Sequence, residues 1–197
     1  MRRKALLAVT NCTAKMLETY AQRDLLPFDV PESGWSDYSM SDALALALMI
    51  DAANVTDLAS ARFLASRALD AVHPVNPFGF TNAETLYAAL VGLDWPDRTD
   101  DDLMYGQIVV GGRYGDIPAQ VARTLEKRYP EATTVKSMLL VDITATATRL
   151  LREGQELGVS EAVVPAMPAD LTGYPDWLRD AETDRRAVDS GWSEAED

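Results

Sequence analysis

The sequence of 197 residues is poor in the side chains on which metal and nucleophilic chemistry most often rests. It holds one cysteine, Cys12, and one histidine, His73. A disulfide within the chain is therefore excluded, and so is a zinc site built from cysteine and histidine. Cys12 has no evident base partner in the sequence, and His73 lies beside prolines, which argues against a catalytic pair. We therefore expect no catalytic residues, no metal site, no cofactor and no enzymatic activity.

Basic residues and long apolar runs are also scarce. The chain carries 18 Lys and Arg against 31 Asp and Glu, a net charge of −13, which argues against coating nucleic acid or anionic membranes through overall charge. No apolar run approaches the ~18 residues that a membrane-spanning helix needs. The apolar stretch after the basic start breaks at Thr10, too early for a secretory signal. Together with the single free cysteine, this predicts a cytoplasmic protein without a membrane partner.

The acidic excess is concentrated near the C-terminus. Residues 151–197 carry 4 basic and 12 acidic side chains, a net charge of −8, whereas residues 1–150 have a net charge of −5. From about Val159 the apolar periodicity is lost, which predicts an acidic, flexible tail over 159–197. Tyr174, Trp177 and Trp192 within it favour a motif that docks on a protein partner. Packing of these aromatics on the chain's own domain, or an inert tail, remain alternatives.

The front of the chain follows helical patterns. Met16, Leu17 and Tyr20 are spaced for one face of a helix. Asn11 or Thr13 can cap that helix, and Ser39 with Asp42 can cap a later one. We expect helices over residues 3–10, 13–23, 43–53 and 57–72, and a hairpin over 28–38.

Two prolines and a glycine between His73 and Gly79 predict a connection. Beyond it, Thr81 is expected to cap a helix, and helices are expected to alternate with strands. We predict helices over 83–92, 117–129 and 145–157, and strands over 104–110 and 135–143. The predicted fold class is α+β. It comprises a helical domain over 1–73, a small α/β region for dimerisation or effector binding over 80–158, and the tail.

Three motifs in the α/β region allow two interpretations each. The glycine-rich turn at 111–115 could hold a phosphate at a helix N-terminus, or it is a tight turn with Asp116 as the cap and Pro118 in the first helical turn. Asp142 could line a ligand site at a sheet edge or act as a helix N-cap. The aspartates between 94 and 102 lack the glycine and glutamate of a calcium loop and indicate a solvated linker.

Several motifs follow one another in a fixed order in the front domain. A short helix, a three-residue break and a second helix with Thr13, Leu17 and Tyr20 are followed by three ordered motifs: Leu25-Leu26-Pro27, Ser33-Gly34-Trp35, and Tyr38-Ser39 with Asp42. This order resembles the N-terminal winged helix-turn-helix domain of MerR-type transcription regulators, over roughly residues 3–72. The resemblance implies a second helix that enters the major groove with its N-terminal end first, a wing on the phosphate backbone, and a homodimer on a palindromic site.

Under this resemblance the partner is double-stranded DNA. The second helix presents Thr13 and Lys15 at its N-terminal end, while Leu17 and Tyr20 face the core. The expected DNA-binding residues are Arg2, Arg3, Lys4, Thr13, Lys15, Arg23, Ser33, Trp35 and Ser36.

Two positions depart from the family pattern. Glu18 occupies a position that is usually basic, and Ser36 and Asp37 stand where the wing usually carries arginine. A carboxylate near a phosphate is repelled, and a missing arginine removes a salt-dependent contact. The sequence therefore predicts a DNA-binding transcription regulator, with a winged-helix protein-interaction adaptor that has lost DNA binding as the alternative. An enzyme with its site near the glycine-rich turn is the third and weakest hypothesis.

Overall fold

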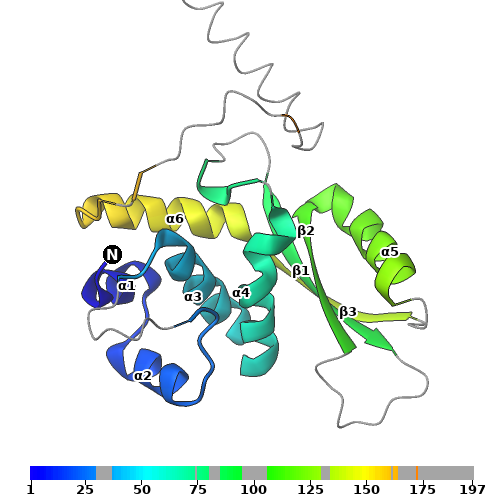
Figure 1. The fold of residues 1–197 in the computed structure, drawn as a ribbon, viewed down its shortest axis with the longest axis horizontal. Helices are drawn as coiled ribbons and strands as arrows, with labels where there is room; N and C mark the ends of the chain where they lie inside the picture. The colour runs from blue at the N-terminus through cyan, green and yellow to red at the C-terminus, as the bar shows by residue number, and fades with distance from the viewer. Residues whose placement is uncertain are drawn as a thin grey trace, which may run out of the picture. The chain divides into compact units, whose positions relative to one another are not determined.

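A computed structural model describes residues 1–29, 37–73, 75–79, 85–94, 106–129, 134–160, 162–163 and 172. Residues Met1–Pro165 form one compact unit and Ala166–Asp197 a second. The described part of the first unit is α+β, as predicted, with six α-helices and a three-stranded antiparallel sheet (Figure 1). The hairpin residues 30–36 and most of the predicted tail lie outside the described residues.

Four helices form the front of the chain and confirm the predicted ones. Their bounds are α1 Arg3–Thr10, α2 Ala14–Gln22, α3 Met40–Ala53 and α4 Leu58–Val72. A capping box starts α3: the Asp42 amide donates to the Ser39 hydroxyl, and the Asp42 carboxylate accepts from the Ser39 amide. Asp57 caps α4 by accepting a hydrogen bond from the Ser60 amide at 2.9 Å.

Helix α3 lies at the centre of the helical part. Seven consecutive residues, Ala43 to Met49, are buried. A helix that is apolar on all sides has to be covered on all sides, and α3 packs against α1, α4 and α6. In Figure 1, α4 lies on one side of α3 and α1 on the other, with α6 running across all three.

The sheet has the strand order β2-β1-β3. Its strands are β1 Leu86–Asp94, β2 Gln107–Arg113 and β3 Thr134–Asp142. Because β1 pairs antiparallel with both neighbours, β2 and β3 run parallel, and α5 Ile117–Arg128 connects them. Two short 3-10 helices, η1 Pro77–Gly79 and η3 Tyr114–Asp116, precede β1 and α5. The final helix is α6 Ile143–Glu156.

One predicted element is wrong in type and one is displaced. The described part of the helix expected over 83–92 is strand β1, and its expected cap, Thr81, lies outside the described residues. The run from Leu86 to Val91 is buried on both faces of the sheet, except for the half-buried Tyr87, so it lacks the alternation that marks a half-buried strand. The strand expected over 104–110 runs instead from Gln107 to Arg113.

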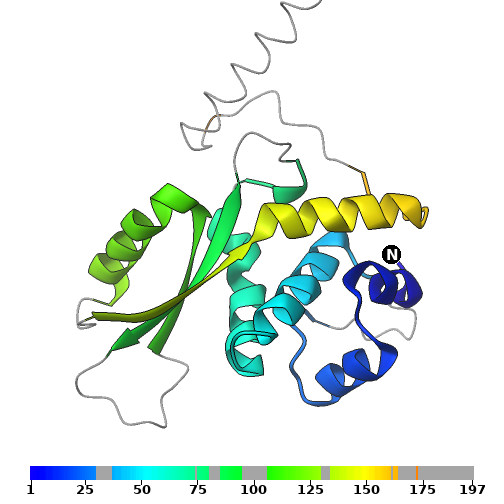
Figure 2. The same ribbon diagram turned by 180° about the vertical axis from the view of Figure 1, so that it is seen from behind.

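Helices cover both faces of the sheet. On one face α5 packs against β2, with Val91, Ile108 and Val121 in the shared core. On the other face α4 packs against β1 and β2, and α6 packs against β1. Figure 2 shows the same arrangement from behind, with α5 on one side of the strands and α4 with α6 on the other.

Asp142 joins β3 to α6. Its carboxylate accepts a hydrogen bond from the Ala145 amide at 2.7 Å, which confirms the N-cap interpretation. Further along α6, Arg149 donates to the Val9 carbonyl in α1 at 3.5 Å and lies 3.8 Å from the Asp51 carboxylate in α3. Through these contacts α6 fixes the front helices to the sheet.

Candidate nucleic-acid interface

A tight turn joins α1 to α2. Asn11 adopts the left-handed conformation, with φ of 54°, and its amide donates back to the Ala8 carbonyl. Asparagine tolerates this conformation better than most residues do. Thr13 then starts α2, because its hydroxyl oxygen accepts a hydrogen bond from the Met16 amide at 3.1 Å. The sequence allows either Asn11 or Thr13 as the N-cap of this helix, and in the structure the N-cap is Thr13.

The inner side of this helix pair is apolar. Leu17, which is predicted to face the core, is buried, and Tyr20, predicted to do the same, is half-buried. Leu26 is buried as well, and Cys12, in the turn, is only 3% exposed. Burial raises the pKa of the Cys12 thiol, although a hydrogen bond from the Leu17 backbone opposes this. The thiol therefore stays protonated at neutral pH, which does not suit a nucleophile.

Besides Arg3, four of the predicted contact residues in α1, in α2 or at the ends of α2 are exposed to solvent. Lys4 and Lys15 are exposed, and Arg23 is exposed at the opposite end of α2. Eight residues separate Lys15 from Arg23, or about 12 Å along a helix axis, so one base pair cannot meet both. Thr13 is exposed as well, but its hydroxyl oxygen already serves as the helix cap.

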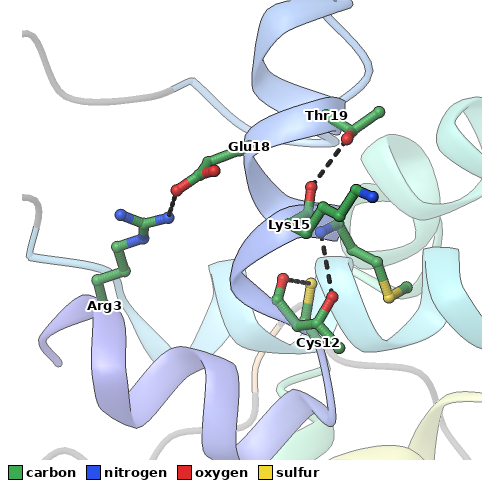
Figure 3. A network of polar contacts seen from close by, with 7 residues as sticks. Arg3, Cys12, Lys15, Glu18 and Thr19 are labelled. Atoms are coloured by element: carbon green, nitrogen blue, oxygen red, sulfur yellow. Dashed lines mark hydrogen bonds and ion pairs between the residues drawn. The ribbon is translucent and has the colours of Figure 1, made fainter.

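Arg3 and Glu18 form a contact that the sequence analysis missed. The Arg3 guanidinium in α1 donates to the Glu18 carboxylate in α2 at 2.7 Å. Figure 3 shows the two side chains pointing toward one another, while Lys15 extends to the other side of α2 in this view. The residues are fifteen positions apart, so only the helix-turn-helix geometry brings them together. Glu18 is the only acidic residue of α2, and its charge is balanced within the domain.

Met1 and Arg2 are bound to the backbone of Asp37 and Tyr38. The Met1 amino group donates to the Tyr38 carbonyl, and the Tyr38 amide donates to the Met1 carbonyl. Arg2 forms an antiparallel backbone bridge with Asp37. The backbone of Arg2 is thus held at the start of α1, next to the acidic residue Asp37. The remaining predicted contacts, Ser33, Trp35 and Ser36, lie outside the described residues.

The charge of this part differs in sign from that of the whole chain. Residues 1–29 contain five basic and three acidic side chains, a net charge of +2, while residues 30–197 have a net charge of −15. The segment that contains α1 and α2 is therefore locally basic within an acidic protein. Such a local excess is what contact with phosphates requires.

A groove opens between the chain that leaves α2 and helix α4. Its volume is about 620 Å³, and its lining includes Leu25, Phe28, Phe63 and Arg67. Arg62 crosses one side: its Nε donates to the Leu26 carbonyl at 3.2 Å, and its guanidinium lies 3.8 Å from the Asp24 carboxylate. The lining of the groove combines apolar side chains with the charged side chains of Asp24, Asp29, Arg62 and Arg67.

The glycine-rich turn serves packing. A side chain at Gly111 would lie 2.7 Å from the Ala71 carbonyl oxygen in α4, so this glycine allows β2 and α4 to approach closely. Pro118 stands in the first turn of α5, as predicted. Asp116 stands at the N-cap position of α5, but its side chain accepts no hydrogen bond from the backbone amides of that helix. The Asp116 carboxylate accepts a hydrogen bond from Arg113 Nε at 2.8 Å instead. A hollow of about 330 Å³ lies at this turn, and its lining includes Tyr87, Tyr114 and Gly115.

Within the described residues, no group of histidine, cysteine, aspartate and glutamate side chains is arranged to hold a metal ion. No helix among them is long and apolar enough to cross a membrane. Comparison with protein-family models gives no match, and comparison with curated proteins gives none either. The case for function therefore rests on the geometry described above.

Proposed function

We propose that the chain is a DNA-binding transcription regulator that reads duplex DNA with the exposed side of α2. The proposal follows the resemblance to the MerR-type winged helix-turn-helix. Lys15 would lie at the DNA-facing N-terminal end of α2, where a recognition helix contacts bases. Lys4 and Arg23 would contact flanking phosphates.

The Arg3–Glu18 ion pair is the observation that carries the proposal. An unbalanced carboxylate on the recognition helix would repel phosphate. Because Arg3 donates to Glu18 at 2.7 Å, the one carboxylate of α2 is balanced within the domain, and Lys15 stands on a helix without an unpaired negative charge. The side chains of Arg3 and Glu18 are both exposed to solvent, so Arg3 can also turn toward a nearby phosphate.

Titration of the full chain with a fluorescent duplex of random sequence over a salt series tests this proposal. We expect the logarithm of the association constant to fall linearly with the logarithm of salt concentration, and Lys15→Ala to weaken binding by about 1–3 kcal/mol. Lys127→Ala removes an equally exposed basic side chain from α5 and is the matched control. No binding at low salt, or equal losses from the two variants, would overturn the proposal.

A protein-interaction adaptor is the second candidate, and the groove between α2 and α4 favours it. Its apolar lining residues Leu25, Phe28 and Phe63 could seat the side chains of a partner helix. The variants Lys15→Ala and Phe63→Glu separate the two functions. Of these two variants, only Lys15→Ala should weaken DNA binding. An adaptor would instead lose its partner through Phe63→Glu and keep it through Lys15→Ala.

A further inference from the structure

Strand β3 leaves one of its edges open. In the order β2-β1-β3, it pairs with β1 on one side, and no described strand or helix pairs with its other side. Figure 2 shows β3 at the edge of the sheet, and residues 134–138 of this strand are exposed. Unpaired backbone amides and carbonyls on an edge strand are ready to accept another strand.

The face of β3 toward α5 is also incompletely covered. Met138 and Val135 pair with Val91 and Leu93 of β1, whose side chains belong to the core beneath α5. Helix α5 packs on β2, at the far edge of the sheet. As a result Val135 is 42% exposed and Met138 is 41% exposed, although both are apolar.

One half of this edge is protected against pairing and the other half is not. The register with β1 shifts between Gly92 and Leu93, which makes Lys136 an extra, bulged residue. Bulges and edge lysines discourage strand addition. From Ser137 to Asp142 the register is regular, and Met138-Leu139-Leu140-Val141 is uncharged.

We propose that a second copy of this chain adds to the sheet through β3, with the two strands antiparallel about a two-fold axis at Leu139. In this register Leu139 lies opposite Leu139 of the second copy, and Met138 lies opposite Leu140. The exposed Met138 side chain is then covered by an apolar neighbour on the same face, since directly opposite residues share a face. Two three-stranded sheets become one of six strands.

Charge complementarity singles out the second copy as the occupant. Lys136 and Asp142 stand at the two ends of the apolar stretch, each three residues from Leu139. Lys136 lies 2.9 Å from the Asp94 carboxylate, but both side chains of that pair are exposed, so the Lys136 ammonium group can reach a second carboxylate. Asp142 uses one carboxylate oxygen to cap α6 and keeps the other for a partner. An axis at Leu139 therefore brings Lys136 of each copy next to Asp142 of the other. An axis at Met138 or Leu140 loses this match and sets one of the charges opposite an apolar residue. Strand β2 is less suited, because α4 and α5 flank it on both faces.

Disulfide cross-linking tests the register directly. Opposite residues in an antiparallel pair have Cα atoms about 5 Å apart, within the range that a disulfide bridges. We expect Leu139→Cys to give a disulfide-linked dimer under mild oxidation. Lys136→Cys places the two thiols about 20 Å apart and is expected to give none. The unaltered chain controls for Cys12, which is buried. Cross-linking at 136 in preference to 139, or at neither, would overturn the register.

Mass in solution tests the association itself. Analytical ultracentrifugation of the full chain without DNA is expected to show a dimer that Met138→Glu converts to a monomer. Leu157→Glu adds the same charge at another exposed apolar residue and should leave the dimer intact. A monomeric unaltered chain, or a dimer that survives Met138→Glu, would contradict the proposal. Capture of an extended peptide by a monomeric chain would assign the edge to a different occupant. The result is independent of DNA binding, because no DNA is present.

Discussion

The Arg3 guanidinium in α1 donates a hydrogen bond of 2.7 Å to the Glu18 carboxylate in α2. The pair joins the two helices of the helix-turn-helix segment across its outer side. It also couples the two residues: when Arg3 turns to a phosphate, Glu18 loses its counter-charge. The DNA affinity of this surface should therefore depend on Glu18 even if Glu18 never touches DNA.

Glu18→Gln is expected to strengthen duplex binding. The substitution removes a negative charge and frees Arg3 for a phosphate, so the salt dependence should steepen by about one counterion. Folding stability should change little, because an exposed ion pair contributes at most about 1 kcal/mol. Fluorescence anisotropy over a salt series measures the duplex affinity and its salt dependence. Glu126→Gln in α5 is the matched control, and equal effects of the two variants would refute the coupling.

Leu26→Ala is expected to destabilise the fold. Leu26 is 6% exposed, and its carbonyl is held by Arg62 of α4, so the side chain anchors the chain that leaves α2. Truncating a buried leucine costs about 2–5 kcal/mol. Urea unfolding measures the change. Leu25→Ala, at a half-buried neighbour, should cost less, and an unchanged midpoint for Leu26→Ala would contradict this anchoring.

Gly111→Ala tests the close approach of β2 to α4. An added methyl group would lie 2.7 Å from the Ala71 carbonyl oxygen, a backbone atom that cannot rotate away. Overpacking of this kind costs about 1–3 kcal/mol. Gly115→Ala is the control, because nothing lies within 4 Å of its added carbon. Thermal unfolding should separate the two variants, and equal midpoints would show that the strand and helix can move apart freely.

Asp57 should make the stability of α4 dependent on pH. Hydrogen bonds from the Ser60 side chain and backbone lower the pKa of Asp57 in the folded state. The stabilisation is therefore present above the unfolded pKa, about 3.9, and is lost as pH falls through the lower folded value. Asp57→Ala should cost about 1 kcal/mol at pH 7. The difference between the unaltered chain and Asp57→Ala, from urea midpoints, should shrink in acid; a constant difference would contradict the charge effect.

The sequence predicts the front of the fold better than the sheet. Helices α1 to α4 are marked by local signals such as the capping residues Thr13, Ser39 and Asp57, which act within four residues. Strand β1 is misread as a helix because its apolar run is buried on both faces, and a short run of this kind fits either element. Strand β1 pairs with β3, whose residues come at least forty positions later, and such a distant pairing leaves no signal in the local sequence of β1.

The candidate interface shows the same division. Lys15 and Lys4, which the resemblance predicts as DNA-binding residues, are exposed, and their contact with DNA stays a prediction. The Arg3–Glu18 pair could not be predicted from spacing, since it depends on the angle between α1 and α2. Thr13 was expected at the DNA surface, yet its hydroxyl oxygen caps α2, a competing role that the sequence also signalled.

The central claim is that α2 meets DNA. Hydrogen–deuterium exchange of the full chain, with and without excess duplex at low salt, tests it most directly because it reports every segment at once. We expect DNA to slow exchange in Ala14–Gln22 and in the turn before it, and to leave Ile117–Arg128 of α5 unchanged. Binding that protects α5 and leaves α2 unaffected would contradict the account.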